Sequence, residues 1–68
     1  MTGLEFRSLR RLAGLTQEQT ARVLEVTHRT VMRWEHGETR ISSLNSEGIR
    51  ARLLKQLFSA QERTDSES

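Results

Sequence analysis

Four side chains between positions 28 and 33 combine groups that can recognise a phosphate-rich partner. His28, Arg29, Met32 and Arg33 follow one another at spacings of one, three and four residues, so an α-helix would place them on one side. The arginine guanidinium is a planar fork of donors that fits phosphate oxygens or a guanine edge in pairs. The same row is also typical of an ordinary solvated helix face, and taken alone that simpler interpretation is the better one.

The overall charge points in the same direction as these side chains. Of the 68 residues, ten are arginine and one is lysine. Residues 1–58 carry ten basic and six acidic side chains, a net charge of +4, whereas residues 59–68 carry one arginine and three acids, a net charge of −2. An arginine-rich globular part favours a nucleic-acid partner. Arginine content also follows genome composition, so it does not decide the partner alone.

Length and composition exclude several classes of protein. A chain of 68 residues without cysteine is a single small domain that no disulfide can stabilise, so helix packing or a second copy must do so. His28 and His36 have no carboxylate or thiol at ligand spacing, and we expect neither a metal nor another cofactor. No apolar run approaches the roughly 18 residues of a membrane span, and the N-terminus lacks a signal-peptide core, so we expect a cytoplasmic protein without membrane contact.

The absence of proline and the spacing of apolar residues predict an all-α fold. The first helix is expected to begin after Thr2 and to end at Gly14, with its apolar face formed by Leu4, Phe6, Leu9, Leu12 and Ala13.

The next two helices are expected to lie very close together in the chain. Thr16 and Gln19 form a capping-box pattern that opens a helix ending near Leu24. Thr27 is the cap of a third helix that ends at Gly37. Only Glu25, Val26 and the capping threonine separate these helices, which forces a sharp turn between them and predicts a helix-turn-helix arrangement. Inward positions are expected at Ala21, Leu24, Val31 and Trp34.

A fourth helix is expected with Asn45 as its cap. Its apolar stripe consists of Ile49, Leu53 and Leu57, and Leu54 and Phe58 widen that stripe beyond what a small core can cover. The polar end of the chain has no apolar residue to bury. We therefore expect one domain over residues 1–60, with a C-terminal dimerisation helix, and a disordered tail over residues 61–68.

The stretch LRRLAGLTQEQTARVLEVTHRTVMRWEHG, residues 9–37, resembles the helix-turn-helix domain of phage lambda-type repressors and Cro proteins, the XRE class. The matching features are LR.LAGLTQE, Ala21, the L.VT turn, Val31 and RWE.G, and they align without a gap. The resemblance implies a compact all-α bundle of four to five helices that binds double-stranded DNA. One departure is Glu25, because the family usually has glycine at this position, where the backbone tends to adopt a positive φ.

The resemblance also implies roles for individual residues. It places one side of the third helix in the major groove, so that base readout would fall to His28, Arg29, Met32 and Arg33. Contacts to the DNA backbone are expected from Gln17, Thr27, Thr30 and Arg40. An acid on this helix would repel phosphate, and in the family the acid equivalent to Glu35 pairs with an arginine of the first helix. Arg10 matches that arginine, and we expect a structural ion pair.

These features predict a transcriptional regulator, expected to be a repressor or autorepressor of a phage, mobile element or toxin–antitoxin-like operon. It would bind a palindromic operator as a homodimer, with Leu54, Leu57 and Phe58 at the interface, and would need no small-molecule ligand. The main alternative is a protein-interaction module, antitoxin-like or anti-repressor in kind, that keeps the fold without reading DNA. An enzyme is a remote third possibility, since the sequence shows no carboxylate pair, nucleophile with base, or phosphate loop.

Overall fold

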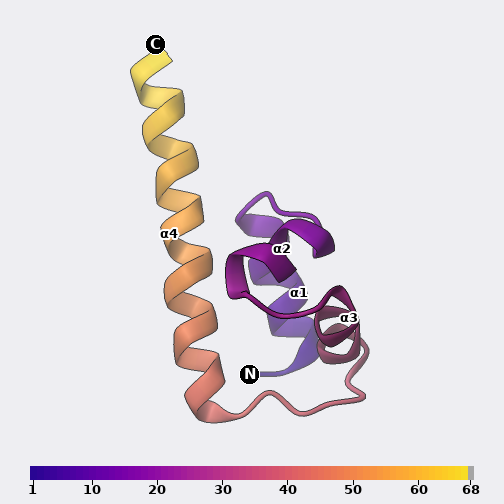
Figure 1. Cartoon of the computed structure of the whole chain (residues 1–68). Coiled ribbons are helices and arrows are strands. Elements are labelled where there is room, and N and C mark those ends of the chain that lie inside the picture. The colour runs from indigo at the N-terminus through magenta and orange to yellow at the C-terminus, as the bar shows by residue number, and fades with distance from the viewer. Residues whose placement is uncertain (68) are drawn as a thin grey trace.

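The computed structural model describes the backbone of residues 1–67 and the side chains of residues 1–59. This part of the chain forms four helices and no strand: α1 (Gly3–Leu12), α2 (Gln17–Leu24), α3 (His28–His36) and α4 (Ser43–Glu67). Helices α1 to α3 form a compact group, and α4 runs along one side of it and extends past it (Figure 1). The all-α prediction is therefore confirmed. None of these helices combines the length and the hydropathy of a membrane span.

The core lies between the three short helices and the first half of α4. Phe6 and Trp34 meet edge to face at its centre, with ring centroids 5.5 Å apart. Such a pair is a favoured aromatic geometry, worth about 1 kcal/mol beyond the buried area. The inward positions predicted for α2 and α3 are confirmed, as are Ile49 and Leu53 of α4, whereas Leu57 of the predicted α4 stripe is only half-buried. The buried apolar residues are Phe6, Ala13, Ala21, Leu24, Val31, Trp34, Ile41, Ile49 and Leu53.

The predicted apolar face of α1 was too wide. Leu4 and Leu12 are 73% and 64% exposed, although Phe6 is fully buried. At 3.6 residues per turn, Leu4 lies on the opposite side of the helix from Phe6, so the two side chains cannot share one core. Two large apolar residues of α1 therefore remain on the molecular surface.

Threonine hydroxyls cap the first three helices as predicted. Thr2 Oγ1 accepts from the Glu5 amide at 3.1 Å, and Thr27 Oγ1 accepts from the Thr30 amide at 3.2 Å. Thr16 and Gln19 complete the capping box through reciprocal bonds of 3.1 and 2.9 Å. These bonds satisfy amide groups that have no partner within their own helix, and each cap typically stabilises a protein by about 1 kcal/mol.

The turn between α2 and α3 is built around a left-handed residue. Glu25 has φ 58° and ψ 42°, and it is the only non-glycine residue with positive φ in the described part of the chain. The amide of the following residue, Val26, donates to the Ala21 carbonyl at 3.0 Å and closes the end of α2. This conformation allows the turn to be short, with only three residues between the end of α2 and the start of α3.

Two boundaries of α4 differ from the prediction. Ser42, not Asn45, caps the helix, because its Oγ accepts from the Asn45 amide at 3.2 Å and its carbonyl accepts from the Ser46 amide at 2.9 Å. At the other end, the backbone stays helical to Glu67, where a disordered tail over residues 61–68 was expected. No glycine or proline follows Gly48 to end the helix, and glutamine, glutamate and arginine are good helix formers. Ser68 lies outside the described residues.

Helices α1 and α3 approach each other closely at Gly3, the first residue of α1. A Cβ atom at this position would collide with the Trp34 carbonyl oxygen and would lie 2.9 Å from the Glu35 carbonyl oxygen. Because only hydrogen occupies this space, the start of α1 can pack directly against the last turn of α3. The packing at Gly3 helps to fix the orientation of α3, whose other side faces solvent.

Candidate nucleic-acid interface

The outer side of α3 presents the four predicted readout residues together. His28, Arg29, Met32 and Arg33 are all exposed, whereas Val31 and Trp34 on the inner side are 0% and 7% exposed. We call these four residues the α3 outer face. Helix α3 lies on the side of the α1–α3 group away from most of α4, so α4 does not cover this face (Figure 1).

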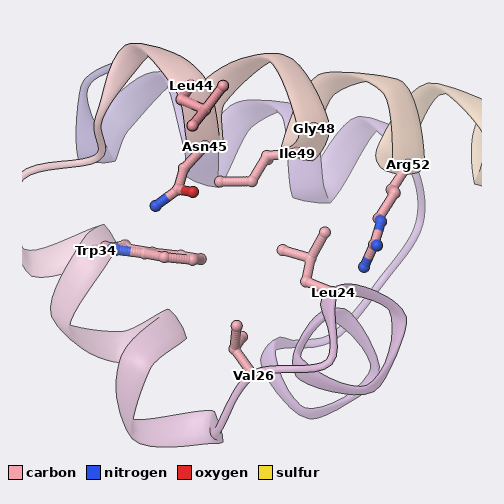
Figure 2. Close-up of a pocket in the computed structure, with 8 residues that line it drawn as sticks. All are labelled: Leu24, Val26, Trp34, Leu44, Asn45, Gly48, Ile49 and Arg52. Atoms are coloured by element: carbon pink, nitrogen blue, oxygen red, sulfur yellow. The ribbon is translucent and has the colours of Figure 1, made fainter.

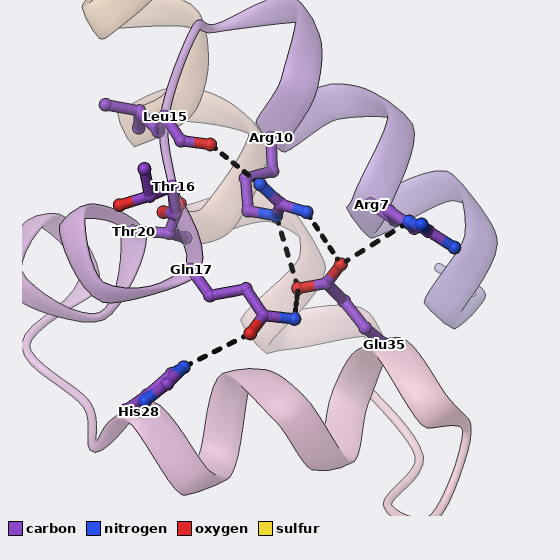
Figure 3. Close-up of polar contacts among 8 residues, drawn as sticks. All are labelled: Arg7, Arg10, Leu15, Thr16, Gln17, Thr20, His28 and Glu35. Carbon is purple, nitrogen blue, oxygen red and sulfur yellow. Dashed lines mark hydrogen bonds and ion pairs between the residues drawn. The ribbon is translucent and has the colours of Figure 1, made fainter.

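The shape and charge of the α3 outer face suit an anionic partner. Arg29, Met32 and Arg33 line a shallow depression together with His36 and Glu38. Glu38 is the only acid in this lining and was not considered as a site residue from the sequence. The other acid nearby, Glu35, lies on the side of α3 that faces α1 and α2, away from Arg29 and Arg33, and its side chain is 5% exposed (Figure 3). The two arginines therefore dominate the charge of this surface.

Arg10 and Glu35 form the ion pair that the resemblance implied. Arg10 donates from Nε to Glu35 Oε2 at 3.2 Å and from Nη2 to Glu35 Oε1 at 3.1 Å (Figure 3). Its third donor, Nη1, binds the Leu15 carbonyl oxygen at 2.8 Å. The arginine side chain is only 11% exposed, so its charge is used within the protein. This pair connects α1 to α3 and holds the acid toward α1, away from Arg29 and Arg33 (Figure 3).

Gln17 extends the ion pair to the start of α3. Its Nε2 donates to Glu35 Oε2 at 3.1 Å, and its Oε1 lies 3.1 Å from His28 Nε2 (Figure 3). The sequence predicted Gln17 as a contact to the DNA backbone through its amide group and did not predict these side-chain bonds. Gln17 and His28 are eleven residues apart in the chain, and the turn between α2 and α3 brings their side chains together.

The other three residues predicted to contact the DNA backbone lie in different surroundings. Thr27 and Thr30 hydrogen bond to each other through their hydroxyl groups, whose oxygens are 2.9 Å apart, beside the start of α3. Arg40 is exposed in the segment between α3 and α4, where it lines a hollow shared with Met1 and the residues that precede α4. The threonines adjoin the α3 outer face, whereas Arg40 lies beyond the opposite end of α3.

The predicted interface residues lie on α4. Leu54 and Phe58 are 41% and 61% exposed, and Leu57 is half-buried. We call these three residues the α4 outer patch. Leu53, by contrast, is fully buried against the short helices. The α4 outer patch is an apolar surface that the described side chains cover only in part, at Leu57.

A second hollow lies between α4 and the turn that joins α2 to α3. Its walls are mainly apolar and include Leu24, Val26, Trp34 and Ile49, with Asn45 and Arg52 among its lining residues (Figure 2). Arg52 Nη1 also donates to the Val23 carbonyl oxygen at 3.4 Å. This hollow therefore separates part of α4 from Trp34 and from the turn between α2 and α3 (Figure 2).

Of the comparisons with known proteins, the one with protein-family models gives a match. Comparison with curated proteins and with solved structures gives no match. A family model described as helix-turn-helix matches residues 6–53, which is more than half of the chain. The matched range contains most of α1, all of α2 and α3 and every predicted DNA contact, and it ends just before the α4 outer patch. The chain belongs to the helix-turn-helix family of the lambda-repressor type, a family of DNA-binding transcription regulators.

Proposed function

We propose that this protein is a sequence-specific repressor, or autorepressor, that acts by occupying an operator in double-stranded DNA. One observation carries the proposal: the α3 outer face exposes His28, Arg29, Met32 and Arg33, while the acid of the same helix is buried on an arginine. An exposed helix face with two arginines, and with Glu38 as the one acid in the depression beside them, is suited to the major groove, where base edges present specific patterns of donors and acceptors. No catalytic role is proposed.

Within this proposal, the side chains of the α3 outer face have different partners. Arg29 and Arg33 each fit the O6 and N7 acceptors of guanine, a bidentate contact worth about 1–3 kcal/mol of discrimination. Met32, 40% exposed between them, can contact a thymine methyl group. The phosphate contacts are assigned to the Gln17 amide at the start of α2, to Thr27 and Thr30, and to Arg40.

We also propose that the protein binds a palindromic operator as a homodimer through the α4 outer patch. A twofold axis would cover Leu54, Leu57 and Phe58 on both chains at once and remove an apolar surface from water. It would also place two α3 helices on half-sites about 34 Å apart, one turn of DNA. The position of α4 beside α1 and α2 supports this, because contact through α4 leaves the α3 outer face open.

Binding-site selection tests the proposed function. The full chain would select from a pool of random duplexes, and the selected site would be compared with a scrambled duplex by mobility shift. We expect Arg29→Ala and Arg33→Ala to lose most of the preference for the selected site. Arg22→Ala is the matched control, because Arg22 is an exposed arginine of α2 that lies outside the α3 outer face, and it should keep that preference. Full discrimination by both Arg29→Ala and Arg33→Ala would overturn the groove assignment.

A further inference from the structure

We propose that His28 reads its base as a hydrogen-bond acceptor, through Nδ1, and thereby selects adenine or cytosine at one position of the operator. The inference rests on the proposed DNA-binding function. It adds a specificity that an exposed histidine does not have by itself, since a neutral imidazole can present either a donor or an acceptor.

The chain of polar contacts begins at a group that can only accept. Both oxygens of the Glu35 carboxylate receive donors from Arg10, at 3.1 and 3.2 Å, and the side chain is 5% exposed. A carboxylate whose two oxygens both accept from an arginine guanidinium acts as an acceptor only. The atom of Gln17 that lies 3.1 Å from Glu35 Oε2 must therefore be its amide nitrogen.

The orientation of Gln17 then determines the proton on His28. With Nε2 of Gln17 on the carboxylate, the amide oxygen Oε1 is the atom that faces His28 Nε2, at 3.1 Å (Figure 3). An amide oxygen is an acceptor only, so the His28 Nε2 atom must carry the hydrogen. A neutral imidazole has a single N–H, and His28 Nδ1 is consequently left with its lone pair.

The position of His28 makes this lone pair available to DNA. His28 is the exposed first residue of α3, and no described side chain or backbone group hydrogen bonds to its Nδ1 atom. The first residues of a recognition helix are those that reach base edges. In the major groove, adenine N6 and cytosine N4 are donors, whereas guanine O6 and N7 and thymine O4 are acceptors. An acceptor on His28 attracts the first two bases and repels the others.

The tautomer can be measured without DNA. In ¹⁵N NMR spectra of histidine-labelled protein at mildly alkaline pH, where imidazoles are neutral, we expect His28 to be almost entirely the Nε2–H form. His36 is an internal reference, because it is exposed on the same helix and no described group hydrogen bonds to its ring. Gln17→Ala should convert His28 to the tautomer mixture of His36 and leave His36 unchanged. An Nδ1–H form, or the His36 mixture in the wild type, would overturn the proposal.

The base preference is measured by site selection at the same pH. The operator position read by His28 is the one whose base preference disappears in His28→Ala. At this position we expect adenine or cytosine to be preferred over guanine and thymine by ~5-fold, since one net hydrogen bond is worth about that factor in affinity. In Gln17→Ala the ring can turn, and guanine should become tolerated there. A wild-type preference for guanine or thymine, or no position that depends on His28, would overturn the inference. If no duplex is selected at all, the DNA-binding function itself fails, and the NMR result still reports the tautomer independently.

Discussion

Gly3 and Glu25 are single residues whose backbone environment matters more than their side-chain chemistry. Gly3 lies where α1 touches the carbonyl groups of α3, so its lack of a side chain is required. Glu25 adopts a left-handed conformation that a glycine would adopt without strain. Glycine is therefore the residue that the backbone requires at position 3, whereas at position 25 a glycine would fit the backbone conformation better than glutamate does.

Gly3→Ala should destabilise the protein by about 1–3 kcal/mol, because the new methyl group forces α1 away from α3. Urea denaturation followed by circular dichroism measures this. Gly48→Ala is the matched control, since a Cβ there meets no atom within 4 Å and the residue lies inside α4. Replacing a helix-interior glycine should stabilise the protein by about 0.5–1 kcal/mol. Equal effects of the two variants would contradict the close approach at Gly3.

Glu25→Gly should stabilise the protein by up to about 1 kcal/mol, because it relieves the cost of a left-handed non-glycine residue. The Glu25 side chain lies 3.9 Å from Arg52, but it is 82% exposed, so the loss of this ion pair should contribute little. The melting temperature measures the gain, and Glu18→Gly, an exposed acid within α2, should lower it instead. A lower melting temperature for Glu25→Gly would show that the turn is not strained.

The elements are held in place by one polar connection as well as by the apolar core. The pair of Arg10 and Glu35 joins α1 to α3, and Gln17 joins α2 to the same carboxylate. All three short helices thus meet at one buried group. Because the Glu35 carboxylate is charged and buried, the loss of any of its hydrogen-bond partners lowers the stability of the folded protein.

Arg10→Ala should destabilise the protein by about 3 kcal/mol, since it leaves the Glu35 carboxylate buried without its main partner. Thermal unfolding would show this, and Arg11→Ala, an exposed neighbour, should change the stability by less than about 0.5 kcal/mol. The double variant Arg10→Met, Glu35→Leu should recover much of the loss, because it removes both charges. A double variant no more stable than Arg10→Ala would contradict this explanation.

The whole molecule has two exposed surfaces on different sides to which the proposals assign functions. The α3 outer face carries charge, and the α4 outer patch carries exposed apolar side chains. This separation suits a dimer that binds DNA, because association and DNA contact need not compete for the same surface.

Leu54→Glu, Phe58→Glu should convert the protein from a dimer to a folded monomer with weaker operator affinity. Sedimentation at micromolar concentration measures the association, and mobility shift measures the affinity. Leu12→Glu is the matched control, because Leu12 is 64% exposed on α1 outside the α4 outer patch. A wild-type protein that sediments as a monomer and binds isolated half-sites would show that the dimer proposal is wrong.

Affinity for DNA should fall steeply with salt, because bound cationic groups release counterions from the phosphates. A plot of log affinity against log salt concentration gives the number of phosphates contacted. Arg40→Ala should reduce this slope by about 1 and should weaken binding to cognate and scrambled duplexes alike. An unchanged slope would remove Arg40 from the DNA interface.

The sequence by itself determined that four helices form and where α1 to α3 begin and end, because caps, glycine stops and apolar spacing act within a few residues, but it misplaced both ends of α4. It also determined the inward positions of Val31, Trp34 and Leu53 and, through the family resemblance, the pair of Arg10 and Glu35. The tertiary structure alone decided the close approach of α1 to α3 at Gly3 and the hydrogen bond between Gln17 and His28. Each of these depends on the distance and angle between helices, and no local pattern of residues encodes those quantities.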